Sequence, residues 1–356
     1  LLEILCHTTF IKLGLREFVS WTYFISGLTI GFLALFNIEK APDLSFIKVA
    51  SKKLKYLYLL GFIAVIIFIV HKSLGLFVKV PLNMKTADML PIMEIMANRF
   101  LNGEAVYDTL QTAWESMKPI YLPGMWTPFL ISSYLKIDPR YITLLALIGA
   151  IFLIFKVNKK NSLLQILVFI AITILVLSII IHQSSLLTMT EEPIVLFYFS
   201  LLAYGLSKRN FLLTTISITL CLLSRYSLAI WALMFVIYFF LYEDKKQGIK
   251  LCLIGLSFGI VIMWFFQGYE NLDVFLGLKS NYIEAIVNSQ WKYEPLIKKS
   301  LGLAKFFAYR DLALLHSIHF YSSLIVPFIL LGIYHFNRTK ISSLSSFIFQ
   351  KIFIFQ

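Results

Sequence analysis

The sequence predicts an all-α polytopic membrane protein with about nine or ten transmembrane helices and a long, partly helical first external loop. Of the 356 residues, 59% are hydrophobic and 14% are charged, whereas about a quarter of the residues in a soluble domain are charged. The mean hydropathy is +0.81, and the apolar residues gather in runs near the length of a membrane span. We therefore expect a single transmembrane domain over residues 1–356.

The apolar runs define the expected spans. Nine of them lie at residues 17–36, 56–77, 141–155, 163–181, 193–206, 211–222, 226–242, 249–266 and 319–335. A tenth run, 120–136, contains Pro123, Gly124 and Pro128, so it is either a short span or a re-entrant piece. The chain begins at Leu1 and stops inside an apolar stretch, and we expect that one or both ends are truncated.

Charge gives the expected orientation. The net charge is +13, and the basic residues collect in short loops between the runs, which is typical of the cytoplasmic side of a membrane protein and gives no reason to expect nucleic-acid binding. If 120–136 does not cross, three segments face outward: 78–120, 182–192 and 267–318. The three cysteines lie in or near apolar runs, so the sequence holds no disulfide framework and no ligand set for a metal.

The first external loop, 78–120, is too long for a simple connection between helices. A helix is expected from Asp88 to Gly103, because Pro91 falls in its first turn and Gly103 fits its C-terminal stop. Its apolar stripe at helical spacing consists of Met89, Ile92, Met93, Met96, Phe100 and Leu101. This helix is expected to lie on the outer membrane surface; the simpler interpretation is a packing helix that covers the bundle.

Few acids lie on the outward side. Asp88 is either the N-terminal cap of the surface helix or, at the membrane boundary, a general base toward a hydroxyl acceptor. Asp108 is the second acid of the loop and is best explained as a turn residue, whereas Glu94 is expected on a solvated face. Glu191 and Glu192 precede Pro193, where acids commonly cap a helix; they also form an acidic pair that would orient an acceptor or hold a cation.

Arg225 lies between two apolar runs, in a turn too short to be a solvated loop. An arginine at membrane depth marks a partner or an anionic ligand, unless it extends to the outer headgroups. Its planar guanidinium suits the phosphate of a lipid-linked substrate. His182, at the outward end of a span, is either an interfacial residue or a group that assists proton transfer.

The sequence contains no Walker A, GxGxxG, GxSxG or HExxH motif, so no nucleotide chemistry is indicated.

The order of these features resembles the GT-C superfamily of integral-membrane glycosyltransferases, in its mannosyltransferase-like and protein-mannosyltransferase-like branches. The likeness covers about residues 56–242. The elements that carry it are an acid soon after an early span (Thr86–Asp88), a Gly-x-x-x-Tyr element (Gly103–Tyr107), a Tyr/Pro-rich entry to the next helix (120–128), an acid before a Pro-led span (190–199) and a lone basic residue in a later span (222–227).

The resemblance implies an inverting hexosyl- or pentosyltransferase in the cytoplasmic membrane, with its site facing outward. Its partners would be the lipid bilayer, a polyprenyl-phosphate sugar donor and a glycan, lipid or protein acceptor. Asp88 would be the base, Arg225 would bind the donor phosphate, and Glu191 or Glu192 would position the acceptor. Tyr107, Tyr121 and His182 would be substrate contacts. No cofactor is implied with certainty, because dependence on a divalent cation varies among such enzymes.

Other classes remain open. A transporter or flippase of lipid-linked or small polar solutes would explain the spans and Arg225, but not the long helical loop, since transporters bind near the midplane between repeated halves. A lipid-linked glycan polymerase or ligase would have its large loop later in the chain, and 267–318 fits that pattern. A scaffold subunit without activity would make the outer acids incidental. The enzyme interpretation expects Asp88, the 191–192 pair and Arg225 at one outward cavity.

Overall fold

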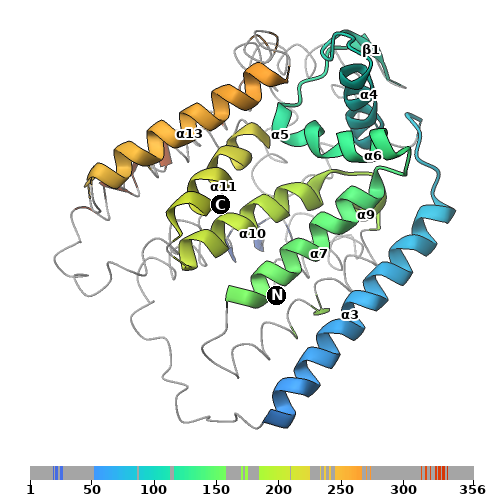
Figure 1. The fold of residues 1–356 in the computed structure, drawn as a ribbon, viewed down its shortest axis with the longest axis horizontal. Coiled ribbons are helices and arrows are strands. Elements are labelled where there is room, and N and C mark those ends of the chain that lie inside the picture. Colours follow the sequence, from blue (N-terminus) through green and yellow to red (C-terminus); the bar gives the residue numbers. More distant parts are fainter. Residues whose placement is uncertain are drawn as a thin grey trace. The chain divides into compact units, whose positions relative to one another are not determined.

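The structure is a computed structural model. It describes residues 52–85, 88–112, 116–157, 184–208, 210–224 and 245–266 continuously, and isolated residues elsewhere, including Glu270. The chain divides into two compact units. One consists of Leu1–Ala41, Ser227–Cys252 and Asp273–Gln356, and the other, which holds most of the described residues, consists of Pro42–Tyr226 and Leu253–Leu272. This unit is mostly helical, as predicted (Figure 1). A short antiparallel ribbon of β1 (Leu110–Gln111) and β2 (Ser116–Met117) is the exception.

Five of the predicted spans are helices. They are α3 (Lys52–Lys79), α7 (Arg140–Val157), α10 (Glu192–Ser207), α11 (Phe211–Ser224) and α13 (Lys245–Phe265). Two stretches, Leu59–Lys79 and Lys245–Phe265, are long and apolar enough to cross a membrane, with mean hydropathies of 2.2 and 2.0. Most of their side chains are exposed. The other predicted spans lie outside the continuously described ranges.

The segment 120–136 does not form a continuous span. It is broken into α5 (Pro123–Trp126), a 3-10 turn η4 (Thr127–Phe129) and α6 (Leu130–Leu135), which ends at Lys136 in the left-handed conformation, with φ 53°. A six-residue helix rises only about 9 Å, so a crossing by a single helix is excluded. Prolines account for the breaks, since a proline is tolerated only in the first turn of a helix.

The helices of this unit pack through small residues. In Figure 1, α10 lies between α7 and α11, and both pairs are in contact. A β-carbon added to Gly149 of α7 would lie 2.8 Å from the ring of Phe197 on α10, so this ring occupies the space that a side chain at position 149 would need. Between α11 and α13, Thr219 Oγ1 lies 3.4 Å from the carbonyl oxygen of Gly255. Together with Gly259, Gly255 makes a G-x-x-x-G pattern on this face, a common contact between membrane helices.

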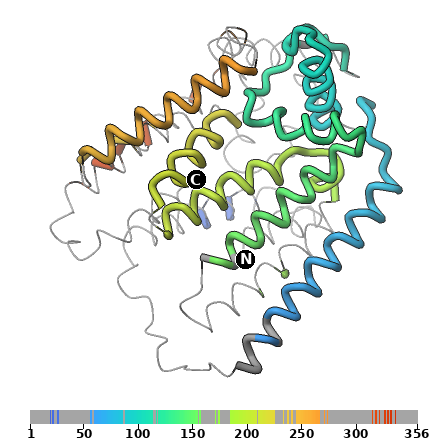
Figure 2. The backbone as a smooth tube through the Cα atoms, viewed as in Figure 1, coloured from blue at the N-terminus to red at the C-terminus, as the bar shows by residue number. Residues whose placement is uncertain are grey.

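One end of the unit collects the predicted external loop (Figure 2). Arg140, at the start of α7, donates from Nη1 to the carbonyl oxygen of Val80, just beyond the end of α3, at 2.7 Å. The hydroxyl of Tyr198, on α10, donates to the carbonyl oxygen of Gly124 at 2.8 Å. The first bond joins the two ends of the segment 80–140, and the second fastens Gly124, inside this segment, to α10.

Candidate functional site

The predicted surface helix is α4 (Met89–Leu101). Gly103 follows it with φ +73°, and the Gly103 and Glu104 N–H groups bond to the carbonyl oxygens of Phe100 and Arg99, which is a glycine-terminated helix end of the predicted kind. Half of the apolar stripe is buried, namely Ile92, Met93 and Met96, and α4 packs against α5, η4 and α6. The contacts therefore match the packing helix that covers the bundle.

Asp88 occupies the position before α4, but its side chain makes no capping hydrogen bond. Its backbone has φ −97° and ψ −28°, which is helical, whereas a capping side chain reaches the first-turn N–H groups from an extended backbone. The cap interpretation of Asp88 is therefore wrong. The carboxylate is partly exposed and is not bound to the helix that it precedes.

The loop after α4 is held in place by hydrogen bonds from a side chain of α4 to backbone carbonyl oxygens of the loop. Arg99 donates from Nη1 to the carbonyl oxygen of Asp108 at 2.5 Å and from Nη2 to that of Thr109 at 3.2 Å. The Asp108 side chain is exposed and its N–H group bonds to the carbonyl oxygen of Ala105 at 3.4 Å, which agrees with its interpretation as a turn residue. Arg99 was assigned no role in the sequence analysis, because its acceptors are backbone carbonyl oxygens, which any residue type can supply.

Tyr107 is buried beneath this loop, with 5% of its surface exposed. Its hydroxyl donates to the carbonyl oxygen of Tyr121 at 3.0 Å and accepts from Trp126 Nε1 at 3.3 Å. Burial raises the pKa of Tyr107 above its usual value; the Trp126 bond lowers this pKa by a smaller amount, and the charge of Glu270 adds a still smaller rise. The Tyr107 hydroxyl therefore stays protonated. These two bonds position the loop, and they give a structural reason for the tyrosine in the Gly-x-x-x-Tyr element.

Glu191 and Glu192 begin α10. Glu191 stands at the cap position, yet it has φ −87° and ψ 0° and makes no side-chain capping bond, so its interpretation as a cap is also wrong. It is almost fully buried, at 1% exposure. Glu192 is partly exposed in the first turn, where the helix dipole favours a negative charge. The two adjacent carboxylates thus have different surroundings, which the sequence could not distinguish.

The sequence analysis missed an ion pair beside this site. Arg140 is 4% exposed as a residue. Its Nε lies 2.9 and 3.0 Å from the two carboxylate oxygens of Asp138, and its Nη2 lies 2.5 Å from Asp138 Oδ2. Its guanidinium carbon is 4.7 Å from the ring centre of Phe77. The available signal was an arginine two residues after an acid, at the head of an apolar run.

Glu94 was expected on a solvated face, but it is only partly exposed. Burial first, and then the charge of Asp138, raise the pKa of the Glu94 carboxyl above its ordinary value. The structure thus brings Glu94 close enough to Asp138 for their charges to interact. The acidic side chains of this unit that are at least partly buried therefore include Glu94 as well as Glu191.

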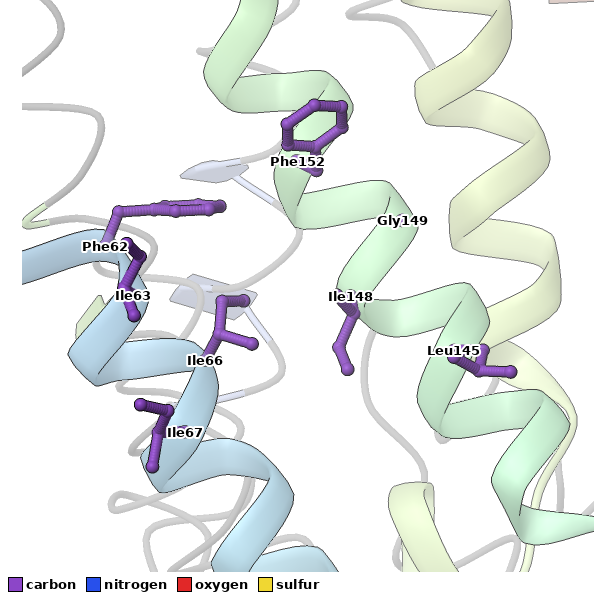
Figure 3. A pocket seen from close by; sticks show the side chains of 8 residues that line it. All are labelled: Phe62, Ile63, Ile66, Ile67, Leu145, Ile148, Gly149 and Phe152. Atoms are coloured by element: carbon purple, nitrogen blue, oxygen red, sulfur yellow. The ribbon is translucent and has the colours of Figure 1, made fainter. Parts of the chain in front are cut away.

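A groove of about 400 Å³ runs between α3 and α7 (Figure 3). Phe62 and Ile66 line it from α3, and Ile148 and Phe152 line it from α7. Every side chain in its lining is a hydrocarbon, so it has no group for acid–base or phosphate chemistry. It lies midway along both helices.

The structure thus gathers Asp88, Asp108, Tyr107 and Tyr121 in the loop that covers one end of the unit. The 191–192 pair begins α10, whose first turns carry Tyr198 and its bond to this loop. Arg225 and His182 lie outside the described residues, as does nearly all of 267–318. Among the described residues, no group of three or more His, Cys, Asp or Glu side chains is placed to hold a metal ion.

No family model matches the chain, and no curated protein or solved structure matches it.

Proposed function

We propose that the protein is a membrane glycosyltransferase that moves a sugar from a polyprenyl-phosphate donor to a hydroxyl acceptor at the outer face of the cytoplasmic membrane. The observation that carries the proposal is the carboxylate of Asp88, which heads α4 but makes no capping bond to it. A partly exposed carboxylate without a capping role can accept a proton from a bound hydroxyl. The resemblance to the GT-C superfamily supplies the reaction class.

In the proposed reaction, Asp88 takes the proton of the acceptor hydroxyl while the acceptor oxygen attacks the anomeric carbon of the donor. The bond between that carbon and the phosphate oxygen breaks, and polyprenyl phosphate leaves with the electron pair. Arg225 stabilises the negative charge that develops on the phosphate. Attack and departure on opposite faces of the sugar invert the anomeric configuration.

The surroundings of Asp88 support a reaction at the membrane boundary. Lys79 ends α3, one of the two helices long enough to cross a membrane, and only eight residues separate it from Asp88. A donor whose lipid tail lies in the bilayer would hold its phosphate at this level. Glu191 or Glu192, at the head of α10, is the second acid of the proposed site and positions the acceptor.

Replacing Asp88 by asparagine tests the base. The change keeps the size of the side chain and removes its basicity, so we expect sugar transfer to fall by about 10²–10⁴-fold, the usual contribution of a general base. Donor binding is expected to persist, because the proposed phosphate contact is Arg225. The measurement is transfer from radiolabelled polyprenyl-phosphate sugars to a panel of hydroxyl acceptors, with the full chain in liposomes.

Glu104→Gln is the matched control, because Glu104 is an exposed acid of the same loop, and this variant is expected to transfer at the wild-type rate. Transfer by Asp88→Asn at the wild-type rate would contradict the role of Asp88. Movement of the donor across the bilayer without sugar transfer would contradict the enzyme and support the flippase alternative.

A further inference from the structure

Helix α6 carries apolar side chains on its exposed face and buries its serines. Ile131, Tyr134 and Leu135 each have more than half of their surface exposed, and Tyr134 reaches 77%. Their spacing of i, i+3 and i+4 places them on one face of the helix. Ser132 is buried, and so is the hydroxyl oxygen of Ser133. A helix at an aqueous surface has the opposite arrangement, so the exposed face of α6 suits an apolar partner.

The neighbours of α6 show which helix of the loop at 80–140 offers an apolar face. α6 is in contact with α4, η4 and α7. In α4, where the sequence predicted a membrane-surface stripe, Ile92, Met93 and Met96 are buried. The apolar face of α6 is instead exposed. Of these two helices, α6 therefore has the larger apolar surface to bring to a membrane.

This surface adjoins one end of a candidate membrane-spanning helix. Val78, in the last turn of α3, is 89% exposed and belongs to the stretch Leu59–Lys79, which is long enough to cross a membrane. The ring of exposed Tyr141, in the first turn of α7, meets that of Phe77 with ring centres 6.0 Å apart. Since α7 begins five residues after α6 ends and the two helices are in contact, α6 lies near the end of α3.

The polar groups around this surface match a headgroup layer. Tyr134 combines an apolar ring with a polar hydroxyl, a composition that is enriched where a membrane meets water. Lys79 ends α3 and Lys136 ends α6, and both side chains are exposed. Asp138 is paired with Arg140, so this pair adds no net charge. The two lysines therefore make the edge of the apolar surface positive, which favours anionic lipids.

We infer that α6 docks into the outer leaflet of the bilayer. Its apolar face lies among the upper acyl chains, and Lys79 and Lys136 bind the phosphate groups of anionic phospholipids. An apolar helix face flanked by basic residues is typical of a segment that lies in the membrane interface without crossing it. The inference takes the outer side from the orientation proposed above and nothing from the proposed reaction, so it holds or fails independently of sugar transfer.

Fluorescence quenching tests the insertion of α6. An NBD label is attached to Leu135→Cys in the full chain in nanodiscs, with Cys6, Cys221 and Cys252 replaced by alanine. Glu104→Cys is the matched control, because Glu104 is an exposed polar residue of the same loop. We expect a phospholipid with a nitroxide at carbon 5 of its acyl chain to quench the label at 135 at least twofold more than the label at 104, and iodide in the buffer to do the reverse.

Two results of this experiment overturn the inference. If iodide quenches the label at 135 as strongly as the label at 104, the exposed face of α6 lies in water. If neither quencher reaches position 135, another part of the chain covers this face.

The affinity for single lipids tests the headgroup contact and needs no cysteine substitution. The full chain in detergent is titrated with anionic dioleoylphosphatidylglycerol and with zwitterionic dioleoylphosphatidylcholine, and the bound lipid is counted by native mass spectrometry. We expect the wild type to bind the anionic lipid at least fivefold more tightly, and the double variant Lys79→Gln and Lys136→Gln to lose this preference. Lys118→Gln, which removes another exposed lysine of the segment, is expected to keep it. Equal affinity of the wild type for both lipids, or an unchanged preference in the double variant, would overturn the inference.

Discussion

Gly124→Ala is expected to destabilise the protein by about 3 kcal/mol, at the upper end of the usual cost of overpacking. A β-carbon at this position would lie 2.7 Å from the backbone carbonyl carbon of Leu223 and 2.8 Å from its oxygen. Backbone atoms in α11 cannot move aside as a flexible side chain does, so α5 would have to shift. That shift would also lengthen the bond from the Tyr198 hydroxyl to the Gly124 carbonyl oxygen.

The effect of Gly124→Ala is measured as a change in the apparent melting temperature of the detergent-solubilised protein. This temperature is read from the loss of the monodisperse peak in size-exclusion chromatography after heating. Gly75→Ala is the matched control, because a β-carbon added at Gly75, inside α3, would meet no atom within 4 Å. This control is expected to be neutral or to stabilise by up to about 1 kcal/mol, since alanine favours a helix over glycine. A Gly124→Ala protein as stable as Gly75→Ala would contradict the close contact of α5 with α11.

Arg140→Met is expected to cost a similar amount, about 3 kcal/mol, because removal of one partner of a buried ion pair leaves the other uncompensated. The arginine side chain is 5% exposed and that of Asp138 is 29% exposed, so the cost falls at the lower end of the range for buried pairs. The Val80 carbonyl oxygen would also lose its donor. The end of α3 and the start of α7 would then no longer be joined by this side chain.

Arg140→Lys distinguishes charge from geometry. A lysine keeps the positive charge but lacks the planar fork that holds both Asp138 oxygens and the Val80 carbonyl oxygen together. We expect it to recover about half of the stability lost in Arg140→Met, measured by the same melting assay. Equal stability of wild type and Arg140→Met would contradict the role of this side chain in closing the loop at 80–140.

Local signals explain the parts of the fold that the sequence predicted correctly. Helix α4 was predicted because apolar spacing, Pro91 and Gly103 all act within a few residues of one another. The prolines and glycine of 120–136 indicated a break, but two alternatives remained, because the choice depends on contacts such as that of Gly124 with Leu223. The pairing of Arg140 with Val80, 60 residues earlier, has no local signal at all.

In the candidate site, too, features with a local sequence signal were predicted and features that depend on distant contacts were not. The positions of Asp88 and Glu191 at the heads of helices were predicted, but their capping roles were wrong. Both residues have helical backbone angles, and this property depends on how the preceding segment enters the helix. The effect of the Glu270 charge on Tyr107 was missed because it joins two segments more than 160 residues apart.

The central claim, that Asp88 is the base of an inverting transfer, is tested most directly by adding azide to Asp88→Asn. Azide is already an anion and has no proton to lose, so it does not need a base. The account predicts that azide restores cleavage of the polyprenyl-phosphate sugar by Asp88→Asn in liposomes and yields a glycosyl azide of inverted configuration. A variant that binds the donor but forms no glycosyl azide, or that forms one of retained configuration, would contradict it.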